Sequence, residues 1–316
     1  SNHSDMNILV TGAKGCVGRN LCSQLHNIKD GKARWYGGVQ VEAVYEYDLG
    51  STPAELDAWC RECDFVFNLA GVNRPQTQEE FMQGNFGFAS VLLDTLRKHG
   101  NRCPVMLSSS VQASLAGRFG NSEYGRSKKA GEELFFSYGE ETGAKVLVYR
   151  FPNLFGKWCR PNYNSAIATF CHNIAHGLPI QVNDRSVEME LLFIDDLVDE
   201  MIGALTGNEH RCEFDGVETV PTENGRYCYV PTTNKTTLGE IVDIINEFNA
   251  MSPTEREDAL KQPRYMDALR ANFSFNKDLE RCVTEYMGKE SEIDFAPLTD
   301  EMFDTLCDAN PDWTLG

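Results

Sequence analysis

The sequence predicts an α/β fold built on a doubly wound parallel sheet, with a smaller and mostly helical C-terminal region. Short apolar runs typical of strands alternate with helical patterns from Met6 to about Phe155, and this alternation favours parallel βαβ units. The first run closes on a glycine-rich turn that leads into a helical pattern. The 316 residues are enough to bury a substantial core around such a sheet.

The predicted strands are apolar and rich in β-branched or aromatic residues. They begin at Met6 and continue at residues 41–49, 64–71, 103–110 and 144–151, and helical segments such as 79–98 separate most of them. Parallel neighbours need crossover connections of this kind, whereas antiparallel neighbours do not. We therefore expect one parallel sheet that is covered on both faces.

The alternation becomes irregular after about Phe155, which indicates a second region. Helical patterns occur at 165–176 and 237–248, and the tail over 251–316 is polar and acidic. We expect a first domain over residues 6–156, rejoined at about 187–205, and a partly interleaved second region over 157–316. Residues 1–5, ahead of Met6, are interpreted as an expression remnant.

Three glycines, Gly12, Gly15 and Gly18, lie between the first strand and the first helical pattern. The first glycine permits a tight turn, the second lets a pyrophosphate approach the backbone, and the third lets helix and strand pack closely. The N-terminus of the helix offers N–H groups and a partial positive charge to phosphates. This position favours a Rossmann-like dinucleotide site over an ordinary tight turn.

Two signals bear on the type of nicotinamide cofactor, and they conflict. Glu46 and Asp48, at the end of the second strand, suit the ribose hydroxyls of NAD(H). Lys14 inside the turn and Arg19 just after it could neutralise the 2′-phosphate of NADP(H). We expect NADP(H) to be favoured, with NAD(H) as the alternative.

A tyrosine and a lysine four residues apart, Tyr124 and Lys128, begin an amphipathic helical pattern and share one helix face. An ammonium group close to a phenol stabilises the phenolate, which makes the phenol a better acid. Ser110 closes the serine-rich strand L-S-S-S and could hold a carbonyl oxygen beside the tyrosine. The three together predict proton transfer coupled to hydride transfer. The alternative for the pair alone is an ordinary surface helix.

Composition excludes several classes of partner. The formal charge of −18 and the pI near 4.8 argue against nucleic acid or an anionic membrane. Eleven scattered cysteines and the lack of an apolar export segment favour the cytoplasm. Cys60 and Cys63 have no second pair nearby, so we interpret them as helix-surface cysteines and predict no metal site.

One interval of this acidic chain, from Thr142 to Asn183, contains no aspartate or glutamate. It does contain basic and histidine side chains, namely Lys145, Arg150, Lys157, Arg160, His172 and His176. A locally basic pocket is what an anionic small molecule requires. A buried segment that merely lacks acids is the alternative.

Several motifs together carry a resemblance to a known family. They are T-G-A-K-G-C-V-G from Thr11, N-L-A-G from Asn68, L-S-S-S, Y-G-R-S-K and R-F-P-N-L-F-G from Arg150. This set resembles the extended short-chain dehydrogenase/reductase family, whose members modify sugar nucleotides. F-P-N-L-F-G-K-W-C-R-P-N-Y-N-S and I-Q-V-N-D-R are similar, more narrowly, to the reductase domains of capsular-polysaccharide enzymes of the CapF type.

The resemblance implies roles for individual residues. Tyr124 would donate the proton. Lys128 would make the Tyr124 phenol a better acid and bind the nicotinamide ribose, and Ser110 would align the ketone. The implied cofactor-binding residues are Gly12, Lys14, Gly15, Cys16, Val17, Gly18, Asp48, Leu69, Ala70, Gly71, Tyr124, Lys128 and Phe151. The implied substrate-binding residues are Asn73, Arg74, Gln112, Asn153, Lys157, Arg160, Asn164 and Arg185.

The resemblance also implies a reaction and partners. It predicts a reductase that acts on a UDP-linked 4-keto-6-deoxy-hexose in the synthesis of a surface polysaccharide precursor. It also predicts a homodimer. A dehydratase of this family needs an acidic pair directly after the catalytic serine, but Val111 and Gln112 follow Ser110 here. We therefore do not expect dehydration. A 4-epimerase or dehydrogenase with bound NAD, and a non-catalytic dinucleotide sensor, remain alternatives. Because only His210 follows His176, we expect no metal-binding domain of the kind that bifunctional members carry.

Overall fold

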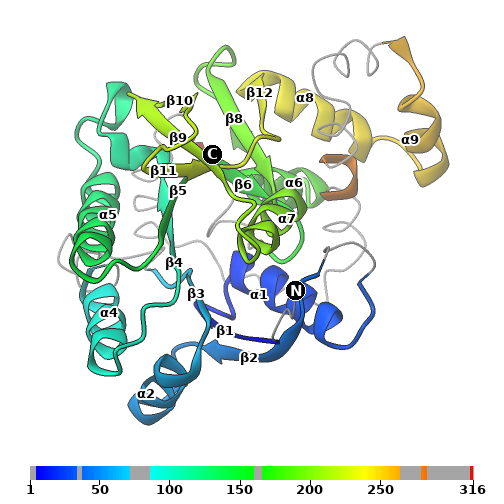
Figure 1. Ribbon diagram of the computed structural model, residues 1–316. Coiled ribbons are helices and arrows are strands. Elements are labelled where there is room, and N and C mark those ends of the chain that lie inside the picture. The colour runs from blue at the N-terminus through cyan, green and yellow to red at the C-terminus, as the bar shows by residue number, and fades with distance from the viewer. Residues whose placement is uncertain are drawn as a thin grey trace. The chain divides into compact units, whose positions relative to one another are not determined.

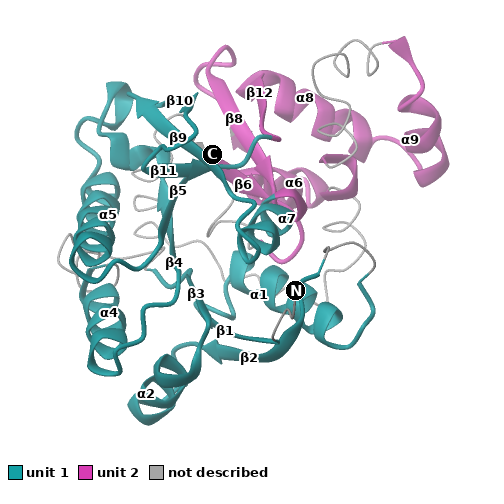
Figure 2. Cartoon of the chain, viewed as in Figure 1, with its two compact units in different colours: residues 1–151, 197–231 teal, residues 152–196, 232–316 magenta. Residues whose placement is uncertain are grey.

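The computed structural model describes residues 5–33, 38–71, 86–159, 166–263, 279–282 and 314–315. These fall into two compact units (Figure 2): Ser1–Phe151 with Leu197–Pro231, and Pro152–Asp196 with Thr232–Gly316. The first unit therefore ends at Phe151 rather than at 156. It is rejoined over Leu197–Pro231 rather than over about 187–205, because strands in that later segment extend its sheet.

An eight-stranded sheet forms the first unit, with the strand order β10-β9-β11-β5-β4-β3-β1-β2. The run from β2 to β11 is parallel, and β9 and β10 are antiparallel additions. The predicted parallel α/β sheet is thus confirmed. Its strands are β1 (Met6–Thr11), β2 (Val41–Tyr47), β3 (Phe65–Asn68), β4 (Val105–Ser110), β5 (Val146–Phe151), β9 (His210–Asp215), β10 (Glu218–Pro221) and β11 (Tyr227–Tyr229).

Helices of the first unit cover both faces of this sheet, with α4 and α5 on one side and α1 on the other (Figure 1). The start of α2 is fixed by a capping box in which Thr52 and Glu55 bond each other's backbone N–H groups. Two short 3-10 turns, at Val111–Ser114 and Gly117–Phe119, connect β4 to α5. The helices are α1 (Cys16–Lys29), α2 (Pro53–Glu62), α4 (Phe88–Lys98), α5 (Glu123–Thr142) and α7 (Ile194–Ala204), the last of which crosses the boundary between the units.

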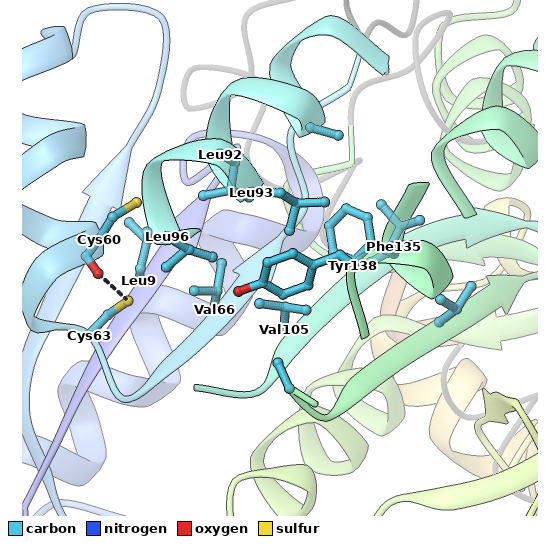
Figure 3. Packing of buried hydrophobic residues seen from close by; sticks show 14 of the residues in the cluster. Leu9, Cys60, Cys63, Val66, Leu92, Leu93, Leu96, Val105, Phe135 and Tyr138 are labelled. Atoms are coloured by element: carbon cyan, nitrogen blue, oxygen red, sulfur yellow. Dashed lines mark hydrogen bonds between the residues drawn. The ribbon is translucent and has the colours of Figure 1, made fainter. Parts of the chain in front are cut away.

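A buried apolar cluster joins α2, α4 and α5 to the sheet (Figure 3). Leu92, Leu93 and Leu96 of α4 are fully buried in it, because the apolar positions of α4 repeat at helical spacing. Cys60 and Cys63 are buried in the same cluster. The interpretation of these two cysteines as helix-surface residues was therefore wrong, since the face of α2 that carries Cys60 packs into this cluster and Cys63, the residue after the helix, is buried with it.

Short strands and helices together make up the described part of the second unit. The expected helices at 165–176 and 237–248 are α6 and α8. Two small sheets, of order β12-β8-β6 and β13-β7, were not expected from the sequence. The elements are β6 (Asn153–Phe155), α6 (Ala166–Ala175), β7 (Ile180–Gln181), β8 (Glu188–Phe193), β12 (Asn234–Thr237), α8 (Leu238–Asn249), α9 (Pro253–Ala259) and β13 (Thr314–Leu315). Among the described helices of both units, none is long and apolar enough to cross a bilayer.

Candidate active site

The candidate site of the first unit follows the carboxyl ends of its parallel strands. Thr11 of β1 is in register with Asn68 of β3, and Ser110 of β4 is in register with Phe151 of β5. The chain crosses from one side of β1 to the other between β2 and β3, which makes this edge a topological switch point. Ligands of open α/β sheets bind at such points. The predicted cofactor residues of this unit lie at or just after the ends of β1, β2, β3 and β5, or in the first two turns of α1 and α5.

The glycine turn after β1 has no room for side chains at two of its three glycines. Gly12 has a φ of +68°, and a Cβ there would lie 2.7 Å from the backbone nitrogen of Ala70. A Cβ on Gly18 would lie 2.1 Å from the carbonyl oxygen of Gly12. The turn is therefore pressed against both its own helix and the chain after β3.

The N-terminus of α1 suits a pyrophosphate. Gly15 is its N-cap residue, and no side chain caps it. The first turn of α1 carries no acidic residue that would repel an anion, and it contains the predicted contacts Cys16 and Val17. Unpaired N–H groups and the helix dipole favour a phosphate at such a terminus. These residues of the turn fit the dinucleotide that the sequence predicts.

Thr11 and Asn68, which were not among the predicted site residues, hold the glycine turn against the chain after β3. The Thr11 hydroxyl donates a 2.6 Å hydrogen bond to the Asn68 side chain and accepts one from the N–H of Ala70 at 3.2 Å. The N–H of Leu69 donates to the carbonyl of Thr11. Thr11 and Asn68 are fully or almost fully buried, and both belong to motifs already noted, T-G and N-L-A-G. Only the paired strands reveal that they bond each other.

The Asp48 carboxylate at the end of β2 is tied to the glycine turn. It accepts hydrogen bonds of 2.7 Å from the backbone N–H groups of Lys14 and Leu49. The Ser51 hydroxyl in turn accepts from the N–H of Asp48 at 3.1 Å. These contacts place a negative charge next to the turn, whereas the side chains of Lys14 and Arg19 are exposed to solvent.

Tyr124 and Lys128 lie one turn apart in the first part of α5, and both are half-buried. The Lys128 ammonium stands 5.5 Å from the centre of the Tyr124 ring. The same ammonium is 3.4 Å from the carbonyl oxygen of Ser108 in β4, to which it donates a hydrogen bond. The lysine therefore reaches from the tyrosine face of α5 back to the serine-rich strand.

Ser110 is linked to the start of α5 through Gln112. The Ser110 hydroxyl accepts a 3.2 Å hydrogen bond from the N–H of Gln112, so its own proton can be donated elsewhere. The Gln112 side chain accepts a 2.9 Å bond from the hydroxyl of Ser122, the N-cap of α5. A Cβ on Gly125 would lie 2.2 Å from the Gln112 carbonyl oxygen, which shows how closely α5 approaches this turn.

Three of the predicted substrate contacts lie in the described part of the second unit. Asn153 is half-buried on β6, and the Lys157 ammonium lies 4.6 Å from the centre of the Trp158 ring. Arg185 forms an ion pair with Asp243 in α8 and donates to the carbonyl of Gly239 at 3.3 Å. Asn73, Arg74, Arg160 and Asn164 lie outside the described residues.

The interval without acids is less basic in the fold than in the sequence. Arg150 is paired with Glu132, and Lys145 is paired with Glu209. Two cations expected in a basic pocket therefore form ion pairs with acids outside the interval, Glu132 in the preceding helix and Glu209 farther along the chain. His172 and His176 lie with ring centres 4.2 Å apart, and no metal-binding group of three or more His, Cys, Asp or Glu occurs among the described residues.

Comparisons with known proteins bear on this site. A reductase of Pseudomonas aeruginosa, "UDP-2-acetamido-2,6-beta-L-arabino-hexul-4-ose reductase", is 44% identical over 202 residues, which is 64% of this chain and 50% of the relative. UDP-glucuronate 4-epimerase 6 of Arabidopsis thaliana is 27% identical over 148 residues, or 46% of this chain and 31% of the relative. The chain thus spans half or less of the length of these two curated relatives.

Solved structures show the same architecture. The capsular polysaccharide assembling protein CapF from Staphylococcus aureus has a TM-score of 0.68 and 36% identity, covering 93% of this chain and 70% of its own. Thermus thermophilus UDP-glucose 4-epimerase, in complex with NAD, has a TM-score of 0.63 at 17% identity over 90% of this chain and 99% of its own, and so shows the fold alone. Residues 8–212, more than half of the chain, match the family described as "NAD dependent epimerase/dehydratase family". This match confirms the resemblance stated from the motifs, and the chain belongs to that family.

Proposed function

We propose that this chain is an NAD(P)H-dependent reductase of a nucleotide-linked 4-keto-6-deoxy-hexose, with UDP as the nucleotide, in the synthesis of a surface polysaccharide precursor. The proposal rests mainly on one observation. Tyr124 and Lys128 share a face of α5, and the N-cap residue of that helix, Ser122, is hydrogen-bonded to Gln112 in the turn after Ser110. The likeness to a reductase of a UDP-linked ketose over 64% of the chain supports the choice of substrate.

The roles of the chain's own residues follow from their positions. The Tyr124 phenol would give its proton to the ketone oxygen, which becomes the hydroxyl of a secondary alcohol. Lys128 would stabilise the phenolate left behind, which then regains a proton from solvent. The Ser110 hydroxyl would donate a hydrogen bond to the ketone oxygen and hold it beside the phenol. A reduced nicotinamide, when bound, supplies the hydride for the carbonyl carbon.

The substrate contacts and the finer cofactor preference belong to the proposal as well. Asn153, Lys157 and Arg185 would bind the sugar and its diphosphate, for which Arg185 would have to exchange its bond with Asp243. The preference for NADP(H) depends on Lys14 and Arg19. We also propose a cytoplasmic homodimer; a mass of about 35.5 kDa by light scattering, that of one chain, would contradict the dimer.

The test combines purified protein, both reduced cofactors and a panel of UDP- and dTDP-linked 4-keto sugars. We expect loss of nicotinamide absorbance with one keto sugar and a product reduced at C4, identified by NMR. Tyr124→Phe should lower kcat by roughly a hundredfold or more, the scale of general acid catalysis. Unchanged turnover by this variant would refute the mechanism.

The same panel separates the alternatives. A 4-epimerase would interconvert UDP-hexoses without net consumption of reduced cofactor, and the purified protein would carry bound NAD. A dinucleotide sensor would bind cofactor in a fixed ratio and turn over none of the sugars. Either result would replace the reductase proposal.

A further inference from the structure

A buried ion pair lies next to the candidate site and takes no part in the proposed chemistry. Glu132 of α5 and Arg150 of β5 have side chains only 1% and 7% exposed. Arg150 donates two hydrogen bonds, of 2.9 and 2.7 Å, one to each carboxylate oxygen of Glu132. Isolated charges are costly to bury, so such a pair persists only with good geometry and further hydrogen bonds.

Two hydroxyl groups complete these hydrogen bonds. The Ser109 hydroxyl donates to the Glu132 carboxylate at 2.6 Å. The Tyr227 hydroxyl accepts from Arg150 at 2.9 Å and donates to Glu132 at 3.4 Å. The Arg150 guanidinium also lies over the Tyr227 ring, 4.4 Å from its centre. One carboxylate thus ties α5 to three strands, namely β4, β5 and β11.

The position of the pair relates it to the catalytic groups. Glu132 follows Lys128 by four residues and Tyr124 by eight, so the three share one face of α5. Ser109 precedes Ser110 on β4, and it is in register with Arg150, which precedes Phe151 on β5. The bonds of Glu132 therefore join the catalytic face of the helix to the strand ends that it must face.

We propose that Glu132 and Arg150 are positioning residues, which hold the Tyr124 and Lys128 face of α5 at a fixed rotation and distance from Ser110. This inference rests on the proposed reductase function. Apolar residues of similar volume often replace a buried ion pair at no cost in stability. Directional bonds from one carboxylate to three strands fix the helix in a way that apolar packing does not.

The test uses the full chain with Glu132→Leu/Arg150→Met, which removes both charges together. We expect kcat to fall by roughly tenfold to a hundredfold, the scale of a 1 Å misplacement. Arg150→Lys keeps the charge but loses the bidentate contact with Glu132, so its kcat should fall by a smaller factor than that of the double variant. This variant replaces the double variant in the test if the latter folds poorly. Glu133→Gln, on the exposed side of the same helix, is the matched control and should change nothing.

A second readout needs neither substrate nor cofactor. Hydrogen exchange of the Gly125 and Arg126 amides, both bonded to Ser122 in the first turn of α5, should become at least about tenfold faster in the double variant, since helix ends open locally first. The amide of Val148 in β5 should stay protected.

The outcomes of the two readouts are distinct. Unchanged exchange in the first turn overturns the inference, whatever the activity, and so does a kcat per folded molecule within about twofold of the original. If the unsubstituted protein reduces no keto sugar, the proposed function fails, and the exchange comparison alone decides whether the ion pair positions α5.

Discussion

At the scale of single residues, we expect the Asp48 carboxylate just after β2 to influence which nicotinamide cofactor binds. Its carboxylate already accepts the N–H groups of Lys14 and Leu49. A negative charge there repels a 2′-phosphate and attracts ribose hydroxyls. We expect Asp48→Ser, which keeps an acceptor for the Lys14 N–H, to raise the ratio of kcat/KM for NADPH over NADH by about tenfold, roughly the effect of one close charge contact near a surface.

The matched control for this prediction is Glu42→Gln, which removes an exposed carboxylate near the other end of the same strand. It should leave the cofactor ratio unchanged. A ratio that stays constant or falls in Asp48→Ser would mean that the ribose lies away from this carboxylate. Steady-state kinetics with each reduced cofactor measure both variants.

At the scale of elements, the close packing of the first turn of α5 against the turn after β4 positions Tyr124. A Cβ on Gly125 would lie 2.2 Å from the Gln112 carbonyl oxygen, so the helix would have to shift away. We expect Gly125→Ala to lower kcat by roughly tenfold or more, because a small displacement of catalytic groups is costly. Its melting temperature should also fall, as overpacking costs about 1–3 kcal/mol.

Gly131 on the same helix provides the matched control. A Cβ there would meet Leu107 at 3.8 Å, an ordinary contact distance. Gly131→Ala should therefore keep full turnover and gain stability by up to about 1 kcal/mol, since alanine favours a helix interior over glycine. Equal kinetics for the two glycine variants would show that the close approach does not set the site geometry.

At the scale of the whole molecule, the segment Leu197–Pro231 returns to the first unit and is held there partly by Glu209. Burial raises the pKa of this carboxyl, but the hydrogen bond from Lys145 and the nearby Arg211 outweigh burial and lower it. A carboxyl with a lowered pKa contributes stability above its unfolded pKa of about 4.3 and loses that contribution as the pH falls through its folded pKa. Glu209→Gln should therefore cost about 1–2 kcal/mol at pH 7, and the difference should shrink below about pH 4.

Urea unfolding of both proteins at a series of pH values measures this effect. The control is Glu213→Gln, which changes a carboxyl in β9, the strand that follows Glu209; this carboxyl accepts a hydrogen bond from the N–H of Arg226. A destabilisation by Glu209→Gln that is the same at about pH 3 and at pH 7 would rule out the ion pair as its source.

The sequence alone was enough for the elements closest to the dinucleotide site. The strands beginning at Met6 and Val41 and those ending at Ser110 and Phe151 lie where their apolar patterns predicted. The glycine turn follows β1, because the steric demands on Gly12 and Gly18 are local. Alternation and turn chemistry are encoded within a few residues, so they could be read without a fold.

Contacts between distant segments could not be read in this way. The residues around Cys60 do not show from sequence alone whether its helix face is exposed or packs on a sheet. Arg150 lies in an interval free of acids, and its partner Glu132 comes from the preceding helix, so local composition suggested a free cation where the fold has an ion pair. Thr11 and Asn68 likewise bond only because β1 and β3 are neighbours.

Residue patterns along the chain were sufficient to predict a parallel α/β unit with a glycine turn typical of dinucleotide sites and a tyrosine-lysine pair on one helix face. Those features depend on residue spacing along a single element, which helix and strand periodicity fix. The tertiary structure decided which charges neutralise each other and how α5 meets the strand ends. That information lies in strand order and register, because a buried charge or a helix rotation is set by neighbours that are remote in the chain.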